Sequence, residues 1–586
     1  MKKLHLLLML SGILMTLTAS AQPSLSWQRI YQKRQLDTHL YGGSVLKISA
    51  TRYAVGGGLS MLDPTVNPGS GRRNRPGLLF INANGDSLGA RQYSLRGLSA
   101  TNPNGAIRSI CRTPFGGIAA MGWMRDSLDH YNNFFFTCDT LGTPLSPFVF
   151  FNVHYVGTAA DSKMLPLPDG YLVIVPRTLT PAHASAAPQQ LGAVFKLDLQ
   201  GNVVWQRIFP ALNLAINDIV PRPDGSYALV GHRFFYRPGQ SSPNYVWVGG
   251  ITAAGDTLPG RLYPNLRGTD YTYANAGQLT PDGGLLLAGY ARALNQAQGS
   301  TLFNQGLLVK LDAQGLVQQT RAIVSPAPGA GFSDAGCRLQ RLSVLASGDA
   351  LAFGYYSTSS TSASALLGSF TGAALQPGFQ LFDTNIFDYP TLLHEPTGRL
   401  LVQGRYFPTP DNSGTLVRSY QNAGVPYQPN LCQAPPVASA GYALNVARDS
   451  LRLVDFSSGG GPYAVVSRWQ WDFGDGSRYD GRFPPIHHYA TLPTAATPIT
   501  LTVTNNLGCV SRQVLYPFAL GTAAARELAA RLSVYPNPAA PDGPVTVQWP
   551  GLRPGPAPVR AQVLDAVGRV VRRGQGISLP SITWKR

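Results

Sequence analysis

Short runs of apolar residues, separated by Gly, Asp, Asn and Pro, follow one another along most of this chain. Residues 193–231 show the pattern most clearly: AVFKLDLQGNVVWQRIF is followed, after a gap, by INDIVPRPDGSYALVGH. Apolar runs bounded by turn residues predict β-strands, and Gly next to Asp or Gln predicts tight hairpins. We predict one four-stranded antiparallel unit here, which must stack with copies of itself to bury its faces.

Six full copies of this unit can be aligned. They occupy residues 77–123, 133–176, 193–231, 248–290, 306–355 and 365–406. A seventh is divided between the ends of the repeat region. WQRIY at 27–31 copies WQRIF at 205–209, residues 44–58 supply an inner hairpin without its outer strand, and residues 415–424 supply an outer strand without an inner hairpin. Joining these pieces closes a ring and removes the free sheet edge.

The repeats resemble the β-propellers of secreted bacterial proteins over residues 22–430. The equivalent last-strand position recurs at Gly57, Gly122, Val175, Gly231, Gly289, Gly354 and Gly404. A β-solenoid or a string of sandwiches is the alternative, but complementary end pieces favour a ring. Composition agrees with an all-β chain, because Gly and Pro are abundant and the only Glu residues are Glu395 and Glu527. We predict a seven-bladed β-propeller followed by two smaller β-domains.

The pattern changes over residues 431–518. WQWDFGDGS, PIHHY and a later apolar strand resemble a PKD domain, an immunoglobulin-like β-sandwich found in bacterial surface proteins and exoenzymes. The matching residues are Trp471, Asp472, Phe473, Gly474, Asp475, Gly476, Pro485, His487 and Tyr489. Trp471 and Phe473 are alternate positions of a strand, which the turn at Asp475-Gly476 ends. One departure is Ala496-Thr497-Pro498, which replaces the usual Gly-x-Tyr before the last strand.

Residues 532–586 resemble the C-terminal sorting domain read by the type IX secretion system of Gram-negative bacteria, after a linker at 519–531 with a short helix-like spacer. The matching residues are Tyr535, Pro536, Asn537, Pro538, Asp565, Gly568, Arg569 and Val570. The resemblance implies the type IX machinery as a partner. The Leu-x-x-Gly-x-Tyr hairpin and basic terminal strand of such domains do not follow, so we expect an incomplete sorting domain.

Residues 1–21 combine Lys2 and Lys3, an apolar run and a small-residue end, which predicts a signal peptide cleaved before Gln22. A membrane anchor is the alternative, but the apolar run is short for a span. We expect a monomer without a transmembrane segment in the mature chain. It would be secreted or attached to the outer-membrane surface, or periplasmic if the incomplete sorting domain fails.

Five cysteines in an exported chain allow disulfides. Cys432 and Cys509 flank the PKD-like domain and are the best pair. Cys111 with Cys138 is a weaker pairing, which would leave Cys337 free.

The net charge of +18 comes mostly from Arg. It would attract anionic polysaccharide, lipopolysaccharide or nucleic acid if the arginines were clustered. Arginines scattered over loops are the favoured alternative, because the run that stands out is only Arg72, Arg73 and Arg75. We therefore predict no specific nucleic-acid partner.

Candidate chemistry is limited to Asp residues, since no GxSxG, HExxH, SxxK or P-loop pattern occurs and Glu is too rare for a paired-Glu glycosidase. Most of them are predicted as turn residues: Asp169, Asp198, Asp224, Asp282 and Asp312. Four others are predicted in loops that lead into the innermost hairpins. In a propeller these loops open onto one mouth of the central channel, and the four residues are Asp161, Asp218, Asp334 and Asp388. There they would bind a cation or sugar hydroxyls, or else cap strand entries on a wet surface.

We predict no cofactor and no metal cluster. Ca²⁺ at Asp472 and Asp475 is the one candidate, beside a structural role for the same residues. His487 is predicted to pack and form hydrogen bonds.

The sequence therefore predicts an exported, non-enzymatic adhesion or binding protein, with a propeller that captures an extracellular glycan or surface polymer and a PKD-like spacer. Fold-level analogy supplies the ligand. The alternative is a propeller polysaccharide hydrolase or lyase that uses the channel-mouth Asp residues. A third reading is an orphaned or frameshifted product of such a gene.

Overall fold

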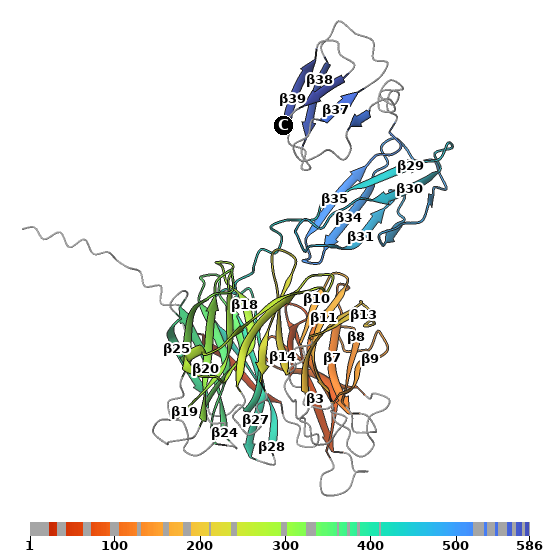
Figure 1. Cartoon of the computed structure of the whole chain (residues 1–586). Helices are drawn as coiled ribbons and strands as arrows, with labels where there is room; N and C mark the ends of the chain where they lie inside the picture. Colours follow the sequence, from red (N-terminus) through yellow and green to blue (C-terminus); the bar gives the residue numbers. More distant parts are fainter. Residues whose placement is uncertain are drawn as a thin grey trace, which may run out of the picture. The chain divides into compact units, whose positions relative to one another are not determined.

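The computed structural model of the chain consists of short β-strands joined by turns and loops (Figure 1). It describes residues 23–31, 43–62, 72–93, 105–125, 131–155, 163–179, 189–209, 213–235, 243–294, 302–323, 336–359, 362–371, 375–383, 387–409, 412–519, 533–535, 545–548, 559–564, 570–576 and 581–584. Over these ranges the only helix is the 3-10 turn η1 (Leu266–Gly268), so the predicted all-β class is confirmed. The same ranges hold no helix with the length and apolar character needed to cross a membrane. The predicted signal peptide and linker helix lie outside them.

The chain divides into two compact units. The first comprises Met1–Ser439, Phe456–Trp469 and Thr502–Arg512. The second comprises Ala440–Asp455, Gln470–Leu501 and Gln513–Arg586. The predicted repeat region therefore belongs to the first unit, together with two segments of the predicted sandwich.

In the first unit the strands form sets of four, most of them two successive hairpins. The first three sets are β2 (Val45–Lys47), β3 (Arg52–Leu62), β4 (Arg72–Asn82) and β5 (Ser87–Gln92); β6 (Gly105–Arg112), β7 (Ile118–Arg125), β8 (Tyr131–Cys138) and β9 (Val149–Tyr155); β10 (Lys163–Leu167), β11 (Gly170–Leu179), β12 (Gln189–Leu197) and β13 (Val203–Ile208). Apolar side chains fill the space between neighbouring sets, as where Phe135 of β8 lies 5.0 Å, centroid to centroid, from Tyr171 of β11. The core is thus divided among the gaps between sheets.

The remaining sets continue along the chain (Figure 1). They are β14 (Leu214–Pro221), β15 (Tyr227–Phe234), β16 (Asn244–Ile251) and β17 (Thr257–Tyr263); β18 (Thr272–Leu279), β19 (Leu285–Leu294), β20 (Leu302–Leu311) and β21 (Val317–Ile323); β22 (Gly336–Val344), β23 (Ala350–Ser359), β24 (Ser362–Thr371) and β25 (Gln376–Asp383); β26 (Phe387–His394), β27 (Leu400–Thr409), β28 (Asn412–Gln421) and β1 (Ser24–Tyr31). A single parallel pair, Asn304 with Gly336, merges the sets β18–β21 and β22–β25 into one eight-stranded sheet.

In four sets a glycine of the second strand lies opposite a β-bulge in the first strand. The register shifts directly after the partners of Gly122, Gly231, Gly289 and Gly354. A Cβ added at Gly289 would lie 1.8 Å from the backbone oxygen of Tyr273, and one at Gly231 would lie 1.9 Å from that of Ala215. The bulge brings the first strand so close that only glycine fits. This close approach explains why glycine recurs at the same position in several copies of the repeat.

The extra residue of a bulge links neighbouring sets. Nδ2 of Asn217 donates to the carbonyl of Ala274 at 2.7 Å, and Nδ2 of Asn275 donates to the carbonyl of Leu339 at 2.7 Å. Each bond joins the first strand of one set to the first strand of the next. The bulge therefore supplies a polar contact between sheets that are otherwise held by apolar packing.

A second repeated contact joins neighbouring sets through their fourth strands. A tyrosine hydroxyl at or just after the end of a fourth strand donates to a glycine carbonyl in the last hairpin turn of the next set. The pairs are Tyr31 with Gly85 (2.5 Å), Tyr93 with Gly142 (2.8 Å) and Tyr263 with Gly315 (2.9 Å). The first of these links the set that contains β1 to the set β2–β5.

The two ends of the repeat region share one sheet. Strand β1 pairs with β28, with Trp27 opposite Ser419 and Tyr31 opposite Thr415. The prediction that segments from the two ends of the repeat region share one sheet is therefore confirmed.

The prediction of which two hairpins form one four-stranded set was wrong: the true set begins one hairpin earlier or later along the chain. β12–β13 and β14–β15, predicted as one unit over 193–231, lie in different sheets. β11 instead pairs with β12 from Tyr171–Leu197 to Leu179–Gln189, across the longer connection. The 44–58 hairpin accordingly has its own outer strands, β4 and β5, and β28 pairs with β27. Side-chain packing, not the length of the connection, decides which hairpins share a sheet.

The strands after the repeat region form small sheets. One contains β29 (Ala440–Leu444), β30 (Ser450–Asp455) and β33 (His487–His488), and another contains β32 (Arg478–Asp480), β31 (Val466–Asp472), β34 (Ile499–Asn505) and β35 (Val510–Leu515). Near the end of the chain, β36 (Ser533–Tyr535), β37 (Val545–Gln548) and β40 (Ser581–Trp584) form one sheet, and β38 (Val559–Leu564) and β39 (Val570–Gly576) form a separate hairpin. Strand β40, in the segment predicted to be incomplete, pairs with β37.

The cysteine predictions are confirmed in part. Cys432 and Cys509 form a disulfide, as predicted, and Cys337 is a free buried thiol. Pairing of Cys111 with Cys138 was wrong, since both are free and buried. Their strands β6 and β8 flank β7, and the two side chains belong to different apolar clusters, so the sulfurs cannot meet. Burial raises the pKa of each free thiol to about 12, which keeps it protonated and unreactive.

Gly289→Ala tests the bulge contact. We expect it to lower the free energy of unfolding by at least about 3 kcal/mol, because the new methyl group meets rigid backbone. Gly268→Ala is the matched control. A Cβ added at Gly268 meets no atom within 4 Å, so the only cost is the strain of an alanine at a φ of +70°, which we expect to lower the free energy of unfolding by about 1 kcal/mol. Equal costs in denaturant unfolding of the two variants would contradict the bulge account.

Candidate functional site

Five side chains lie together where the first strands of neighbouring sets begin, which we call the entry end. They are His232 (β15), Tyr273 (β18), Tyr290 (β19), Arg338 (β22) and Tyr355 (β23), and we call them the aromatic row. Strand register brings them there, because Tyr273 is opposite Tyr290 and Arg338 is opposite Tyr355. All five are half-buried, so each keeps part of its surface accessible.

The aromatic row is a continuous series of contacts. The rings of His232 and Tyr273 meet edge to face with centroids 4.9 Å apart. Tyr273 and Tyr290 stack at 4.2 Å with planes inclined by only 8°. The guanidinium carbon of Arg338 lies 4.8 Å from the Tyr290 centroid, and its Nη1 donates to the Tyr355 hydroxyl at 3.5 Å. Aromatic and cation–π contacts thus connect three neighbouring sets.

The imidazole of this row is neutral at physiological pH. Burial lowers the pKa of His232 to about 4, against a smaller opposing effect of a hydrogen bond to the backbone of Ala274. Nδ2 of Asn217 lies 3.2 Å from Nδ1 and donates to it. Burial also raises the pKa of Tyr290. The row therefore presents rings and phenol groups together with one fixed positive charge.

Sequence analysis missed this row, although the repeat contains a signal for it. The residue after the repeat glycine is a ring in four copies: Trp123, His232, Tyr290 and Tyr355. Once the glycine is placed opposite the bulge, the next residue of the second strand must lie at the entry end. The missing information was the strand register.

The predicted site residue Asp218 does not lie in a loop. It belongs to β14, just after the bulge, and only 3% of it is exposed. Its Oδ1 pairs with Nζ of Lys163 and accepts the Ile219 N–H at 2.8 Å, while Oδ2 accepts the Gly277 N–H at 3.0 Å. The carboxylate links three sets, which corrects both the loop position and the wet-surface alternative.

The other predicted carboxylates are not brought together by the described residues. Asp388 falls within β26 and not in a loop, and its side chain lies outside the description. Asp161 and Asp334 lie outside the described ranges. A cluster of these carboxylates stays a prediction.

The Asp residues predicted for turns do lie in turns. Oδ1 of Asp198 accepts the N–H groups of Gln200 and Asn202, and Oδ1 of Asp312 accepts those of Gln314 and Leu316. The same holds for Asp224 with Ser226 and Asp282 with Gly284, while Asp169 pairs with Lys196. These carboxylates stabilise hairpins.

In the second unit, the PKD-like motif folds into a compact cluster. Trp471 is 1% exposed and its Nε1 donates to the Gly481 carbonyl at 3.0 Å. Phe473 is buried and stacks on His487 with centroids 4.1 Å apart. The hydroxyl of Tyr489 donates to the Phe473 carbonyl at 3.0 Å. His487 therefore packs and forms hydrogen bonds in the way predicted.

The acidic residues of this motif are engaged in its turn. Asp472 accepts the Gly474 N–H and pairs with Arg478. Burial raises the pKa of Asp475, but hydrogen bonds from Ser477 and His487 outweigh that effect and lower it to about 2. Both Ser477 Oγ and Asp475 Oδ2 contact the same His487 nitrogen, Nε2, so these three residues do not form a proton relay. Gly474 and Gly476 adopt φ angles of 79° and 92° in this turn.

Most of the predicted sorting motif lies outside the description. Tyr535 ends β36 and Val570 begins β39, but their side chains are not described. Outside the described ranges lie Pro536, Asn537, Pro538, Asp565, Gly568 and Arg569.

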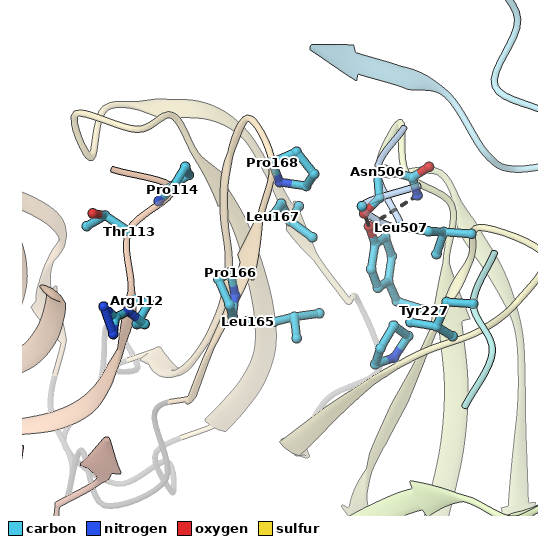
Figure 2. Close-up of a pocket in the computed structure, with 13 residues that line it drawn as sticks. Arg112, Thr113, Pro114, Leu165, Pro166, Leu167, Pro168, Tyr227, Asn506 and Leu507 are labelled. Atoms are coloured by element: carbon cyan, nitrogen blue, oxygen red, sulfur yellow. Dashed lines mark hydrogen bonds between the residues drawn. The ribbon is translucent and has the colours of Figure 1, made fainter. Parts of the chain in front are cut away.

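A cavity of about 360 Å³ lies in the first unit at the other end of the sets, where first and second strands join (Figure 2). We call this the turn end. Asn506 Nδ2 donates to the Gly225 carbonyl at 2.8 Å and to the Tyr227 hydroxyl at 3.2 Å. The other walls are mostly apolar, among them Pro114, Leu165, Pro166, Leu167, Pro168, Pro221 and Leu507. Such walls offer few groups to orient a polar ligand.

One serine–histidine pair resembles a nucleophile with its base. Oγ of Ser343 lies 2.6 Å from Nδ1 of His394, whose Nε2 lies 3.0 Å from the Gly424 carbonyl oxygen. Ser343 is only 3% exposed, so a substrate cannot reach it. Among the residues described, no three His, Cys, Asp or Glu side chains come together as a metal site.

No protein-family model and no curated protein matches the chain. Solved structures with a similar fold include a protein of unknown function from Dyadobacter fermentans (9% identity, 68% of this chain and 99% of that chain, TM-score 0.37). They also include the polysaccharide lyase Uly1 (10%, 68% and 100%, 0.42) and CoXyl43, a GH43 β-xylosidase/α-arabinofuranosidase from a compost microbial metagenome (11%, 50% and 98%, 0.27).

These neighbours include propeller-type folds, and two of them, the lyase and the xylosidase/arabinofuranosidase, are named as enzymes. The expectation that this chain is not an enzyme is contradicted by them and is withdrawn.

The protonation of His232 gives a testable pH dependence. An unfolded His binds its proton near pH 6.5 and the folded one near 4, so falling pH in this window favours the unfolded state. We expect the melting temperature of the wild type to drop more than that of His232→Gln between pH 6.5 and 4, with no further divergence below pH 4. Parallel curves would contradict a half-buried imidazole that is held neutral by partial desolvation.

Proposed function

We propose that this chain is an exported polysaccharide-active protein whose first unit is a seven-bladed propeller that binds a sugar chain at its entry end. The aromatic row is the observation that carries the proposal. Sugar rings present C–H faces that pack on aromatic faces, and phenol groups bond their hydroxyls. Two stacked tyrosines, an imidazole and a guanidinium in contact offer both kinds of interaction.

The arrangement of strands supports a ring of seven. Among the described strands, seven sets of four can be counted when the eight-stranded sheet is divided at its single parallel pair, Asn304 with Gly336. β1 completes the set β26–β28, and Tyr31 of that set contacts Gly85 of the set β2–β5. The last set is therefore a neighbour of the first, as a closed ring requires.

Cleavage of the bound chain, by hydrolysis or by elimination, is the activity we propose. Asp161, Asp334 and Asp388 stay the candidate carboxylates. Asp218 is excluded because its oxygens are occupied by Lys163 and backbone N–H groups. Within this proposal the aromatic row holds the substrate and does not itself react.

The remaining domains fit a protein that works outside the cell. We propose the PKD-like sandwich as a spacer or interaction module and the last β-strands as a sorting domain for the type IX machinery. The predicted signal peptide would begin export. The place of the mature protein is then the medium or the outer-membrane surface.

Tyr290→Ala tests the row as a sugar-binding surface. The variant removes the ring that contacts both Tyr273 and Arg338. We expect about tenfold weaker binding to a soluble polysaccharide that the wild type binds, or about 1.4 kcal/mol, by calorimetry. Tyr290→Phe keeps the ring and should bind within about threefold of the wild type.

The same samples test cleavage. We expect the wild type to release reducing ends or unsaturated sugars from the polysaccharide it binds, and Tyr290→Ala to release them more slowly at low substrate concentration. Binding that is unchanged in Tyr290→Ala, with a native circular dichroism spectrum, would refute the row as the binding surface. Binding without release from any polysaccharide tested would refute the cleavage activity.

A further inference from the structure

We infer that Asp270 is a sugar-binding residue at the entry end, where its carboxylate accepts two neighbouring hydroxyl groups of a sugar ring beside Tyr245 and Phe235. The inference rests on the proposed function, because it adds a second contact for the sugar chain that the aromatic row holds. It also narrows the ligand to a sugar with a pair of free hydroxyl groups on adjacent carbons.

Asp270 stands at a position that recurs in the repeat. It lies two residues before the first residue of β18. Asp161 and Asp334 stand at the same distance in the sequence before the first residues of β10 and β22. Two roles stay open for Asp161 and Asp334, which are to bind a ligand or to cap the entry of a strand. The structure describes the side chain of Asp270 and so shows what an acidic residue does at this position.

The carboxylate of Asp270 does not cap its strand. In the part of the chain that the structure describes, it accepts the Tyr245 hydroxyl at 3.3 Å and no backbone N–H group. Thr269 caps instead, because its Oγ1 accepts the Tyr271 N–H at 3.2 Å. The turn residue Asp312 differs, since it binds two N–H groups of its own hairpin. A carboxylate has about four acceptor sites, so most of those of Asp270 are available to a ligand.

The segment that carries Asp270 is fixed by bonds to two strands. The Asn244 N–H of β16 donates to the Asp270 carbonyl at 2.7 Å. On the other side, the Arg292 N–H of β19 donates to the Tyr271 carbonyl at 2.8 Å, and Oγ1 of Thr269 donates to the Arg292 carbonyl at 2.5 Å. The Asp270 side chain is nonetheless exposed. A carboxylate on fixed backbone loses little freedom when it binds, which favours a binding role.

Two rings lie beside this carboxylate. Tyr245 and Phe235 contact each other, with centroids 5.4 Å apart and planes inclined by 56°. Both are half-buried, and Tyr245 contacts Asp270 through its hydroxyl. A sugar ring carries apolar C–H groups and hydroxyl groups on adjacent carbons, so rings next to a carboxylate match both. Hydrogen bonds to an ionised acceptor are roughly twice as strong as those between neutral groups, which makes the carboxylate the stronger contact.

This site lies next to the aromatic row. Tyr273 of the row follows Asp270 by three residues, which span at most about 11 Å in an extended chain. One sugar chain can therefore contact both, with different units along its length. The row would pack against the rings of the chain, and Asp270 would bind the hydroxyl groups of a neighbouring unit.

Asp270→Asn tests the inference in the full-length mature protein. The probes are four neutral polysaccharides, arabinoxylan, laminarin, dextran and pullulan, and binding is measured by calorimetry with and without EDTA. We expect the variant to bind the probe that the wild type binds best about tenfold more weakly, because a neutral amide accepts weaker hydrogen bonds than a carboxylate. Its melting temperature should equal that of the wild type, because the Asp270 carboxylate does not bind backbone N–H groups.

The matched control is Asp312→Asn, which removes the same charge from a hairpin turn at the turn end and keeps an oxygen that can bind the turn. It should bind the probe like the wild type. Equal losses of affinity in Asp270→Asn and Asp312→Asn would overturn the inference and leave total charge as the cause.

The other outcomes separate the inference from the proposed function. Wild-type affinity in Asp270→Asn, with binding lost in Tyr290→Ala, would overturn the inference and keep the proposed function. Loss of wild-type binding in EDTA would make a cation the ligand of Asp270, and a lower melting temperature of Asp270→Asn would make the residue structural; each overturns the inference. Failure of the wild type to bind any probe would refute both.

Discussion

The close approach of a glycine to a β-bulge is the constraint on which the rest of this structure depends. At Gly122, Gly231, Gly289 and Gly354 the backbone of the first strand occupies the space of a side chain. The bulge aims Asn217 and Asn275 at the next set, where each closes a 2.7 Å bond to a backbone carbonyl. The same register carries the next residue of the second strand to the entry end. One local irregularity therefore fixes both the contact between sheets and the position of the aromatic row.

The two ends of the first unit differ because they follow different local rules. Hairpin turns need short acidic side chains, which places Asp at the turn end. The entry end has no such requirement, and the repeat places rings and arginines there. Tyr273, Tyr290 and Arg338 thus combine a stacking surface with a charge. At the turn end, Asn506 donates hydrogen bonds to the Tyr227 hydroxyl and to the Gly225 carbonyl, and the surrounding walls are mostly proline and leucine.

Much of the fold could be predicted from the sequence, because turn chemistry and strand patterns are local. The strands, the turn Asp residues and the pairing of Trp27–Tyr31 with the segment after Asn412 all follow from such patterns. The choice of which hairpins share a sheet does not follow from local patterns, because the pairing of β11 with β12 depends on packing between residues that are distant in the sequence. Asp218 was misplaced for the same reason, because an acidic residue near a strand start looks identical whether it faces solvent or a buried lysine. The row needed the register of three sheets, which no single stretch encodes.

Hydrogen exchange, followed by mass spectrometry with and without a bound polysaccharide, tests the central claim most directly. If sugar chains bind at the entry end, slower exchange will appear in peptides from β18, β19, β22 and β23. Peptides that contain Pro166 to Pro168 or Asn506 to Gly508, which line the cavity in Figure 2, will then be unchanged. Protection limited to those cavity peptides, with none at the aromatic row, would contradict the account.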